Sequence, residues 1–197
     1  MHAALKESNG DTIMKDEKHI ILIGFKNTGK STVGRMLAHD IQKNFIDLDE
    51  RIEAIYTEKT QEKLSCRQIM YKQGESYFRA LESEALNDAI QSESAVISLG
   101  GGAPLRGENQ TLIKPYLILH VTAPRGIVFE RIMINGRPAF FSPDESPFEF
   151  FTRIWEEREK VYKELADMMV NNNGTLSQTV ELAKEALDAF KVRKIKT

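Results

Sequence analysis

One segment of the sequence has residue types and spacing typical of phosphate binding. Residues 24–31 read GFKNTGKS and match the pattern G-x-x-x-x-G-K-[ST]. Glycines in such a loop let successive backbone N–H groups point into one concavity, and a following helix adds the positive end of its dipole. Lys30 would place a full charge at the β and γ phosphates, and Ser31 would offer its hydroxyl to Mg²⁺. The segment therefore predicts binding of ATP or GTP together with Mg²⁺.

Two carboxylates follow in the stretch FIDLDE. Asp47 and Asp49 are two residues apart, so their side chains project to the same side if an extended strand continues through both. One of them could attend a hydrated Mg²⁺ while the other holds the hydroxyl that accepts the phosphoryl group. The alternative is structural, with Asp49 capping a helix and Asp47 on the surface.

Two further features have the chemistry of an acceptor site. Arg79 and Glu82 are three residues apart on an expected helix, where they can hold each other in place. Three glycines at 100–102 follow a buried-type strand, and glycines allow close approach of the backbone to a ligand. An ordinary surface ion pair and a plain sharp turn are the alternatives for these two features.

The surrounding pattern predicts the elements that position these residues. Continuous apolar runs predict buried strands at 19–25, 45–48, 95–99, 116–121 and 168–171. Helices are expected at 30–42, 49–90 with breaks near 57–60 and at Gly74, 124–134, 148–166, and from a cap at Ser177 to about 190. The Gly- and Pro-rich stretch 135–147 is expected to be an irregular loop. Alternating strands and helices indicate an α/β fold with a parallel sheet, which binds ligands at the carboxyl ends of its strands.

Length and composition limit the possible functions. The 197 residues suit one domain at 18–197 after a flexible leader at 1–17, which resembles neither a secretory signal nor a transit peptide. A net charge of −2 gives no overall field that would favour nucleic acid, and no apolar run is long enough to span a membrane. The single cysteine, Cys66, suits a reducing compartment. We expect a cytoplasmic monomer without nucleic-acid or membrane partners.

The ordered series of motifs resembles the shikimate kinase family of small P-loop kinases. The resemblance covers nearly all of residues 19–190. The matching motifs are GKST in the phosphate loop, DLD at 47–49, FRALE at 78–82, GGG at 100–102, RP at 137–138 and ERxxxYxExAD at 157–167. The family implies a three-layer α/β/α P-loop kinase with a five-stranded parallel sheet. It also implies transfer of the γ-phosphoryl group of ATP to the 3-hydroxyl of shikimate, a step in aromatic amino acid biosynthesis.

The resemblance also implies roles for matched positions. Lys30, Asp49 and Arg137 would be catalytic, with Asp49 binding the acceptor hydroxyl and Arg137 closing over the transferred phosphate from a lid. Arg79 and Arg158 would clamp the shikimate carboxylate, with Gly101 and Gly102 against the acceptor. Ser31 and Asp47 would serve Mg²⁺, Asp47 through water. The ATP-binding residues would be Gly24, Asn27, Thr28, Gly29, Lys30, Ser31, Thr32 and the adenine-stacking Arg131.

Other functions remain open from the sequence. A related kinase for another carboxylated polyol, such as gluconate, would also use the two arginines, and only a substrate panel separates it. A weakly catalytic nucleotide-binding module is a second alternative, although all the expected charged groups are present. A nucleoside monophosphate kinase fits FRALE and the glycine turn less well. Asn27 departs from the glycine that the family commonly has at this position.

Overall fold

The computed structural model describes residues 4–5, 16–134 and 145–195. Its sheet has the order β1-β6-β5-β2-β4-β3. The strands are β1 (Ala4–Leu5), β2 (Asp16–Ile23), β3 (Asn44–Asp47), β4 (Ala95–Ser98), β5 (Tyr116–Thr122) and β6 (Met168–Asn171). All pairs among β2 to β6 are parallel, which confirms the expected five-stranded parallel sheet. The two-residue β1, which the sequence did not predict, pairs antiparallel with β6 at the edge.

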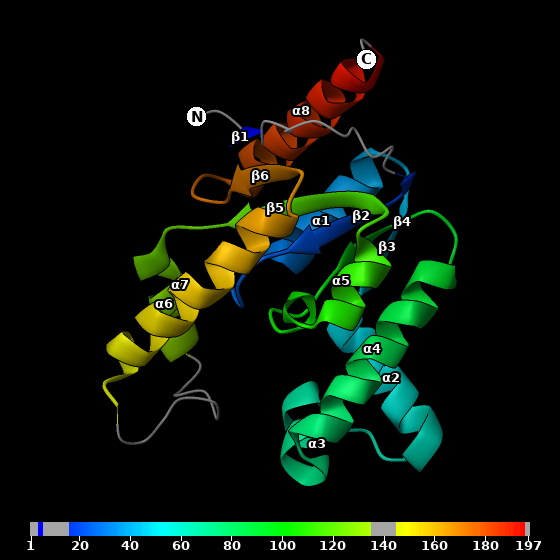
Figure 1. Ribbon diagram of the computed structural model, residues 1–197, viewed down its shortest axis with the longest axis vertical. Coiled ribbons are helices and arrows are strands. Elements are labelled where there is room, and N and C mark those ends of the chain that lie inside the picture. Colours follow the sequence, from blue (N-terminus) through cyan, green and yellow to red (C-terminus); the bar gives the residue numbers. More distant parts are fainter. Residues whose placement is uncertain (1–3, 6–15, 135–144, 196–197) are drawn as a thin grey trace.

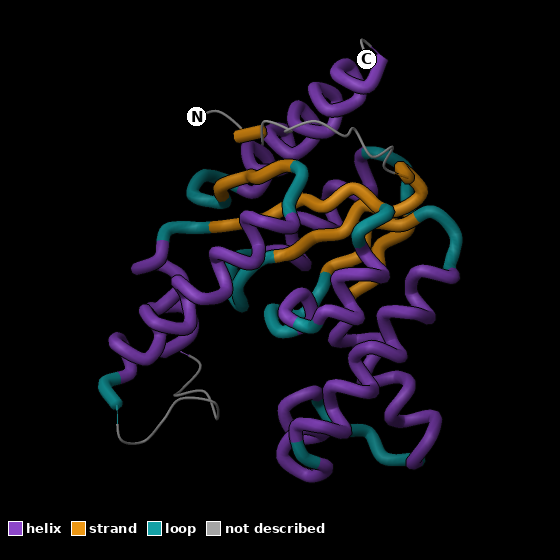
Figure 2. Tube along the Cα trace, viewed as in Figure 1, coloured by secondary structure: helices purple, strands orange, loops and turns teal. Residues whose placement is uncertain are grey.

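Helices cover both faces of the sheet and give three layers (Figures 1 and 2). The helices are α1 (Lys30–Asp40), α2 (Leu48–Thr60), α3 (Cys66–Gln73), α4 (Glu75–Gln91), α5 (Gly107–Ile113), α6 (Arg125–Ile134), α7 (Pro147–Leu165) and α8 (Leu176–Ile195), with a 3₁₀ turn, η1 (Ala103–Leu105). Helices α1 and α8 pack on one face, and α4, α5 and α7 pack on the other. Figure 1 shows α2, α3 and α4 gathered into a lobe beside the sheet.

The strands alternate their side chains between two hydrophobic clusters. In β2, Ile20 and Leu22 pack against α1 and α8, while Ile21 and Ile23 face the opposite cluster. These four side chains are at most 3% exposed, because a central parallel strand is covered on both faces. Trp155 is also buried, in the cluster on the α7 side.

Several element boundaries differ from the sequence prediction. The first break in the helical stretch predicted at 49–90 falls at residues 61–65 instead of 57–60, because helix α2 continues to Thr60. Thr175, not Ser177, caps the last helix: its hydroxyl accepts the N–H of Gln178, whose side-chain oxygen accepts the N–H of Thr175. The last helix also continues past 190 to Ile195. Helix α5 and the turn η1 were not predicted.

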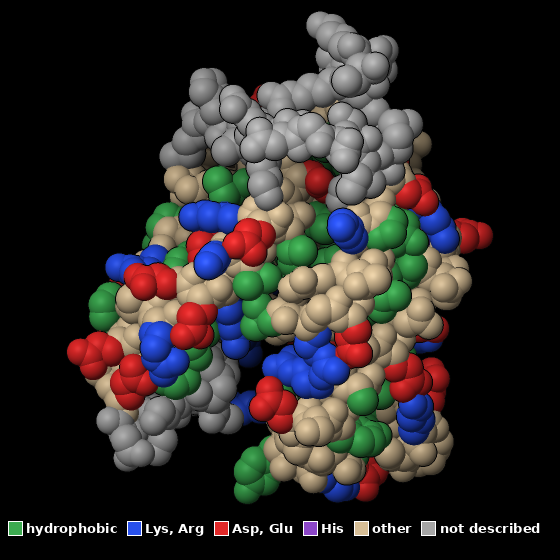
Figure 3. All heavy atoms as spheres, viewed as in Figure 1, with side chains coloured by type: hydrophobic (Ala, Val, Ile, Leu, Met, Phe, Trp, Pro, Cys, Tyr) green, Lys and Arg blue, Asp and Glu red, His purple; other side chains and the backbone are tan. Residues whose placement is uncertain are grey.

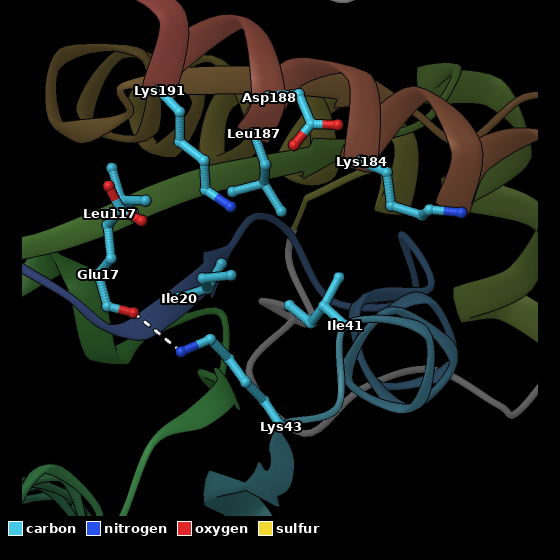
Figure 4. Close-up of a pocket in the computed structure, with 9 residues that line it drawn as sticks. All are labelled: Glu17, Ile20, Ile41, Lys43, Leu117, Lys184, Leu187, Asp188 and Lys191. Atoms are coloured by element: carbon cyan, nitrogen blue, oxygen red, sulfur yellow. Dashed lines mark hydrogen bonds between the residues drawn. The ribbon is translucent and has the colours of Figure 1, made fainter. Parts of the chain in front are cut away.

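A hollow of about 350 Å³ lies at the amino ends of the strands, opposite the phosphate loop (Figure 4). Apolar side chains of β2, β5 and α8 form part of it, and Lys43, Lys184 and Lys191 border it. The Lys43 ammonium donates to the backbone oxygen of Glu17 at 2.9 Å, so this lysine ties the start of β2 to the connection between α1 and β3. None of the residues assigned to phosphate or acceptor binding lines this hollow.

None of the helices in the described ranges is long and apolar enough to cross a membrane.

Candidate active site

The phosphate loop connects the end of β2 to the first turn of α1, as the motif requires. Loop residues Gly24, Phe25 and Thr28 are buried, while Lys26 is exposed and Ser31 and Thr32 begin the helix with intermediate and exposed side chains. Thr28 donates its hydroxyl to the backbone oxygen of Phe25 at 3.0 Å, which closes the loop on itself. The predicted ATP-binding residues from 24 to 32 therefore lie together at the carboxyl end of β2.

Gly29 has a positive φ of 93° and precedes the first helical residue. A Cβ atom there would overlap the side-chain amide of Asn172, which donates to the backbone oxygen of Thr28 at 2.8 Å. Thr179 in turn donates its hydroxyl to the Asn172 amide oxygen at 3.0 Å. Asn172 therefore braces the phosphate loop from the end of β6, a role that no motif in the sequence indicated.

Asn27 adopts a left-handed conformation with φ of 64°. Asparagine tolerates this region better than most residues with a side chain, so the loop keeps its shape without the family's usual glycine. Arg131, in the last turn of α6, donates to the Asn27 backbone oxygen at 3.2 Å. The expected adenine-stacking arginine thus lies beside the phosphate loop.

The Lys30 side chain is the central cation of the site. It is 7% exposed, and its ammonium donates to the Phe25 backbone oxygen at 2.8 Å. Burial lowers the Lys30 pKa to about 8, while Asp49 and Asp47 oppose the shift and Lys26 adds to it. Both predicted carboxylates therefore lie close enough to act on the charge of Lys30.

The geometric premise for Asp47 and Asp49 was wrong, because the strand does not continue through both. Strand β3 ends at Asp47, and Leu48 already begins α2. Asp47 is the N-cap of α2 and accepts the backbone N–H of Asp49 on Oδ1 at 3.0 Å. The alternative of a cap at Asp49 is also wrong. Both carboxylates still lie at the carboxyl edge of the sheet, one at the end of a strand and one in the first helical turn.

Asp49 faces the glycine turn at 100–102. A Cβ atom on Gly100 would lie 2.9 Å from the Asp49 carboxylate and 3.5 Å from that of Glu82. Although Asp49 keeps substantial solvent contact, protein groups on several sides desolvate its carboxylate and raise its pKa. The charge of Asp47 raises this pKa further, and Lys30 opposes it. A raised pKa suits a group that accepts a proton from a hydroxyl.

Arg79 is fixed by the carboxylate one helical turn ahead. Its guanidinium donates to Glu82 at 2.9 Å, which confirms the mutual support expected from their spacing. Glu82 is 2% exposed, and burial raises its pKa although Arg79 opposes the shift. A Cβ on Gly102 would lie 2.5 Å from the Arg79 guanidinium, so the glycine lets the arginine lie along the turn. The sequence alternative of an ordinary surface pair is wrong, since Arg79 is only 19% exposed.

Arg158 reaches the same region from helix α7. Its guanidinium carbon lies 5.3 Å from the centroid of the Phe25 ring, which belongs to the phosphate loop. Arg158 also interacts with the hydroxyl of Tyr162, one turn further along α7. That hydroxyl donates to the Gly101 backbone oxygen at 2.6 Å. The glycine turn thus lies between Arg79 on α4 and the pair of Arg158 and Tyr162 on α7.

A space-filling view shows a cleft between the side formed by α6 and α7 and the lobe of α2 to α4 (Figure 3). Lysine and arginine side chains lie along its walls in this view. The molecule carries a net charge of −2, so the positive charge of this cleft is local. Such a concentration favours small anionic ligands.

His120 lies behind the phosphate loop at the carboxyl end of β5. It is 1% exposed, and within the described residues neither ring nitrogen has a hydrogen-bond partner. Burial lowers its pKa to about 4, with further lowering by the charges of Lys163 and Lys30. His120 is therefore neutral at pH 7 and adds no charge beneath the loop.

Arg137 and Ser31 are the remaining residues predicted to act on the transferred phosphate and its metal ion. Arg137 lies outside the described residues. Ser31 is placed with its hydroxyl oxygen 3.5 Å from that of Ser98, at the end of β4. Ser98 was missed, yet a polar residue closing the apolar run AVIS at the carboxyl end of a strand was a usable signal.

The arrangement brings three kinds of group to one edge of the sheet. The phosphate loop and Lys30 can hold a polyphosphate, Asp49 can orient a hydroxyl, and Arg79 and Arg158 can bind a carboxylate in forked geometry. These groups suit transfer of a phosphoryl group between two small anionic substrates, for which positioning and charge neutralisation supply most of the catalysis.

Comparisons with known proteins identify relatives of this chain. A sequence model of the shikimate kinase family matches residues 26–190. A shikimate kinase from Clostridium botulinum is 31% identical over 169 residues, which cover 85% of this chain and 96% of the relative. A bifunctional shikimate kinase/3-dehydroquinate synthase from Thermotoga maritima is 32% identical over 176 residues, covering 89% of this chain but 34% of the relative. This chain thus spans about a third of that protein.

A solved structure, shikimate kinase from Acinetobacter baumannii in complex with shikimate, has a TM-score of 0.75 and 26% sequence identity, and the match covers 89% of this chain and 94% of that one. The family match extends over most of the chain and includes the phosphate loop from Lys26, the glycine turn and helix α7. The chain therefore belongs to the shikimate kinase family.

Proposed function

We propose that this protein transfers the γ-phosphoryl group of ATP to the 3-hydroxyl of shikimate. The observation that carries the proposal is the convergence of two arginines from separate helices on one glycine turn. Arg79 lies along Gly102, and Arg158 is linked through Tyr162 to Gly101. The family relatives and the shikimate complex of the Acinetobacter baumannii enzyme support the choice of acceptor.

The acceptor would lie between the glycine turn and Asp49. Arg79 and Arg158 would bind its carboxylate, while the backbone of Gly101 and Gly102 would approach its ring. Asp49 would orient the attacking hydroxyl and take its proton, a role that its raised pKa supports. Arg137 remains proposed as the lid arginine on the basis of the family resemblance.

ATP would be held by the backbone of residues 24–32 and by Lys30, with Arg131 at the adenine. In this structure the Lys30 ammonium is held by the Phe25 oxygen. The negative charge of the β and γ phosphates would raise the lowered pKa of Lys30 and keep the ammonium protonated.

The residues present also fit a magnesium ion. Ser31 and Asp47 offer oxygen atoms, and no group of three or more His, Cys, Asp or Glu residues suited to a metal occurs in the described ranges. Mg²⁺ in phosphoryl-transfer sites takes one or two protein oxygens and completes its shell with water and phosphate. When bound, the ion would neutralise charge on the β and γ phosphates. Ser31 and Asp47 are the proposed holders, Asp47 through water.

An ADP-release assay tests this function. Protein with ATP and Mg²⁺ should release ADP when shikimate is added, and much less without it or with gluconate. Asp49→Asn should lower turnover by about a hundredfold or more, because the hydroxyl loses its base. The fold should persist, since the Asp49 side chain is largely at the surface. Turnover on gluconate above that on shikimate, or ATP binding without turnover on either, would contradict the proposal.

We also propose that the protein is a cytoplasmic monomer with a single domain at 18–197. Light scattering behind a sizing column should give a mass near 22.4 kDa. A mass near twice that value would contradict the monomer.

A further inference from the structure

Tyr162 is a buried polar residue that the proposed chemistry does not use. It lies on α7 with 0% of its surface exposed, and its hydroxyl donates to the backbone oxygen of Gly101 at 2.6 Å. A tyrosine hydroxyl can donate one hydrogen bond and accept others at the same time. The interaction with the Arg158 guanidinium uses the accepting side. One buried oxygen atom thus joins the glycine turn to the arginine proposed to bind the acceptor.

The hydrogen bond to the Gly101 oxygen orients the whole peptide unit between Gly101 and Gly102. The oxygen of Gly101 and the N–H of Gly102 belong to the same planar trans peptide unit, in which they point in opposite directions. Holding the Gly101 oxygen on Tyr162 therefore directs the Gly102 N–H away from α7. Within residues 16–134 and 145–195, no backbone oxygen accepts the N–H of Gly101 or Gly102. These donors are left for a ligand, beside the guanidinium of Arg79.

The same contact connects the turn to the phosphate loop. Gly101 packs against the loop, since a Cβ atom there would lie 3.3 Å from the backbone nitrogen of Lys26 and 3.6 Å from the Tyr162 hydroxyl. Arg158 lies over the ring of Phe25, whose backbone oxygen holds the Lys30 ammonium. A shift of the Tyr162 hydroxyl would therefore move the turn and the arginine together.

We propose that Tyr162 is a positioning residue for the acceptor. Its hydroxyl holds the peptide between Gly101 and Gly102 and the Arg158 guanidinium in one fixed arrangement that receives the carboxylate and ring hydroxyls of the substrate. This inference rests on the proposed shikimate kinase activity and adds a residue that none of the predicted roles included. Tyr162 acts through the turn and Arg158 and does not itself touch the reacting atoms.

Tyr162→Phe removes the hydroxyl and retains the ring. The KM for shikimate should rise about tenfold, which is the size expected for losing one well-made hydrogen bond at about 1.4 kcal/mol per factor of ten. The KM for ATP should stay within about twofold, because the backbone and lysine that hold phosphate are unchanged. If Tyr162 had a purely structural role, the substitution would lower the stability of the protein and would not raise the KM for shikimate more than the KM for ATP.

Tyr56→Phe is the matched control. Tyr56 is also 0% exposed, and its hydroxyl accepts one hydrogen bond, from the Gln73 side chain at 3.0 Å, away from the glycine turn. This variant should lose similar stability in a urea titration but keep the wild-type KM for shikimate. Equal KM changes in the two variants would overturn the inference.

Binding without turnover gives a second readout. Trp155 is the single tryptophan of the chain and lies 5.1 Å from the Phe25 ring, so its fluorescence should report acceptor binding. The shikimate Kd of Tyr162→Phe should rise about tenfold in this titration. In an Arg158→Met background, Tyr162→Phe should raise the shikimate Kd by about threefold or less, because the arginine that Tyr162 positions is absent. Full additivity of the two changes would contradict positioning through Arg158.

The outcomes separate this inference from the proposed function. If wild-type protein does not phosphorylate shikimate, the proposed function fails. If wild-type protein does so and Tyr162→Phe keeps the wild-type KM and Kd, only the positioning role fails. Should the Phe variant not fold, Tyr162→Met replaces it, since it also lacks the donor but packs differently. A wild-type Kd in that variant overturns the inference equally.

Discussion

Asp47 caps the helix that carries Asp49: its Oδ1 atom accepts the Asp49 backbone N–H at 3.0 Å. The carboxylate proposed to serve Mg²⁺ therefore also fixes the first turn of α2, where the proposed base lies. A capping side chain holds its backbone partner at a set distance, so one local motif fixes Asp47 relative to the backbone of Asp49.

This double role predicts that Asp47→Asn and Asp47→Ala differ in stability but share a weaker response to Mg²⁺. Asparagine caps helices about as well as aspartate but carries no charge. Alanine has no charge and cannot cap the helix. Asp47→Ala should be less stable than Asp47→Asn by about 1 kcal/mol in urea unfolding. Both should require more Mg²⁺ for half-maximal activity than wild type. An asparagine variant with the wild-type Mg²⁺ dependence would show that the carboxylate serves only as the cap.

Lys30→Met should stabilise the nucleotide-free protein at pH 7 while abolishing most activity. The lysine pKa falls from 10.5 to about 8 on folding, so the unfolded chain binds the proton more tightly. At about 1.4 kcal/mol per pKa unit, a charged Lys30 costs about 3 kcal/mol below pH 8. The lost bond to Phe25 offsets about 1 kcal/mol. The variant should therefore be about 2 kcal/mol more stable at pH 7.

The pH dependence tests the cause of that gain. The cost of Lys30 is fully present below about pH 8 and fades as the pH rises from 8 through 10.5, above which the lysine becomes neutral in both states. The stability advantage of Lys30→Met should shrink over this window in urea titrations. Lys160→Met, at an exposed position on α7, should show no such trend. A constant advantage from pH 7 to 10 would exclude the lysine charge as its source.

Gly102→Ala should weaken acceptor binding selectively. The added Cβ would lie 2.5 Å from the Arg79 guanidinium, so the arginine must leave its place along the turn. We expect the KM for shikimate to rise about tenfold, the loss of a charge-assisted hydrogen bond, with the KM for ATP unchanged. Gly107→Ala is the control, because no atom lies within 4 Å of its added Cβ. If both variants keep the wild-type KM, Arg79 does not bind the acceptor from this position.

Asn172→Ala should weaken binding of the nucleotide and leave binding of the acceptor unchanged. It removes the amide that donates to the Thr28 oxygen at 2.8 Å and braces the phosphate loop beside Gly29. We expect the KM for ATP to rise about tenfold because one partly buried hydrogen bond is lost, and the KM for shikimate to change little. Asn173→Ala, at the exposed next position, should match wild type in both. A larger effect on shikimate than on ATP would refute the assignment to the loop.

Local patterns in the sequence were sufficient to predict most of the fold. The apolar run in β2 and the helical spacing after Lys30 place the phosphate loop between a strand and a helix, where the structure has it. The pairing of Arg79 with Glu82 also followed from helical spacing alone. These features depend on residues within a few positions of one another, so their physical cause is present in the sequence itself.

The end of β3 shows where local reasoning fails. Extended geometry through Asp47 and Asp49 was a reasonable expectation, but Leu48 is fully buried in the core and is already the first residue of α2. Packing of a side chain against distant elements decided that boundary, since tertiary contacts override weak local preferences.

The sequence by itself determined that this chain has a phosphate loop, a parallel α/β fold and the motifs of the shikimate kinase family. Only the tertiary structure decided which groups meet. Tyr162 and Gly101 are 61 residues apart, and Asn172 and Thr28 are 144 apart, yet each pair shares a hydrogen bond. Such contacts arise because parallel strands bring their carboxyl ends to one edge of the sheet, and no local pattern encodes which side chains face each other there.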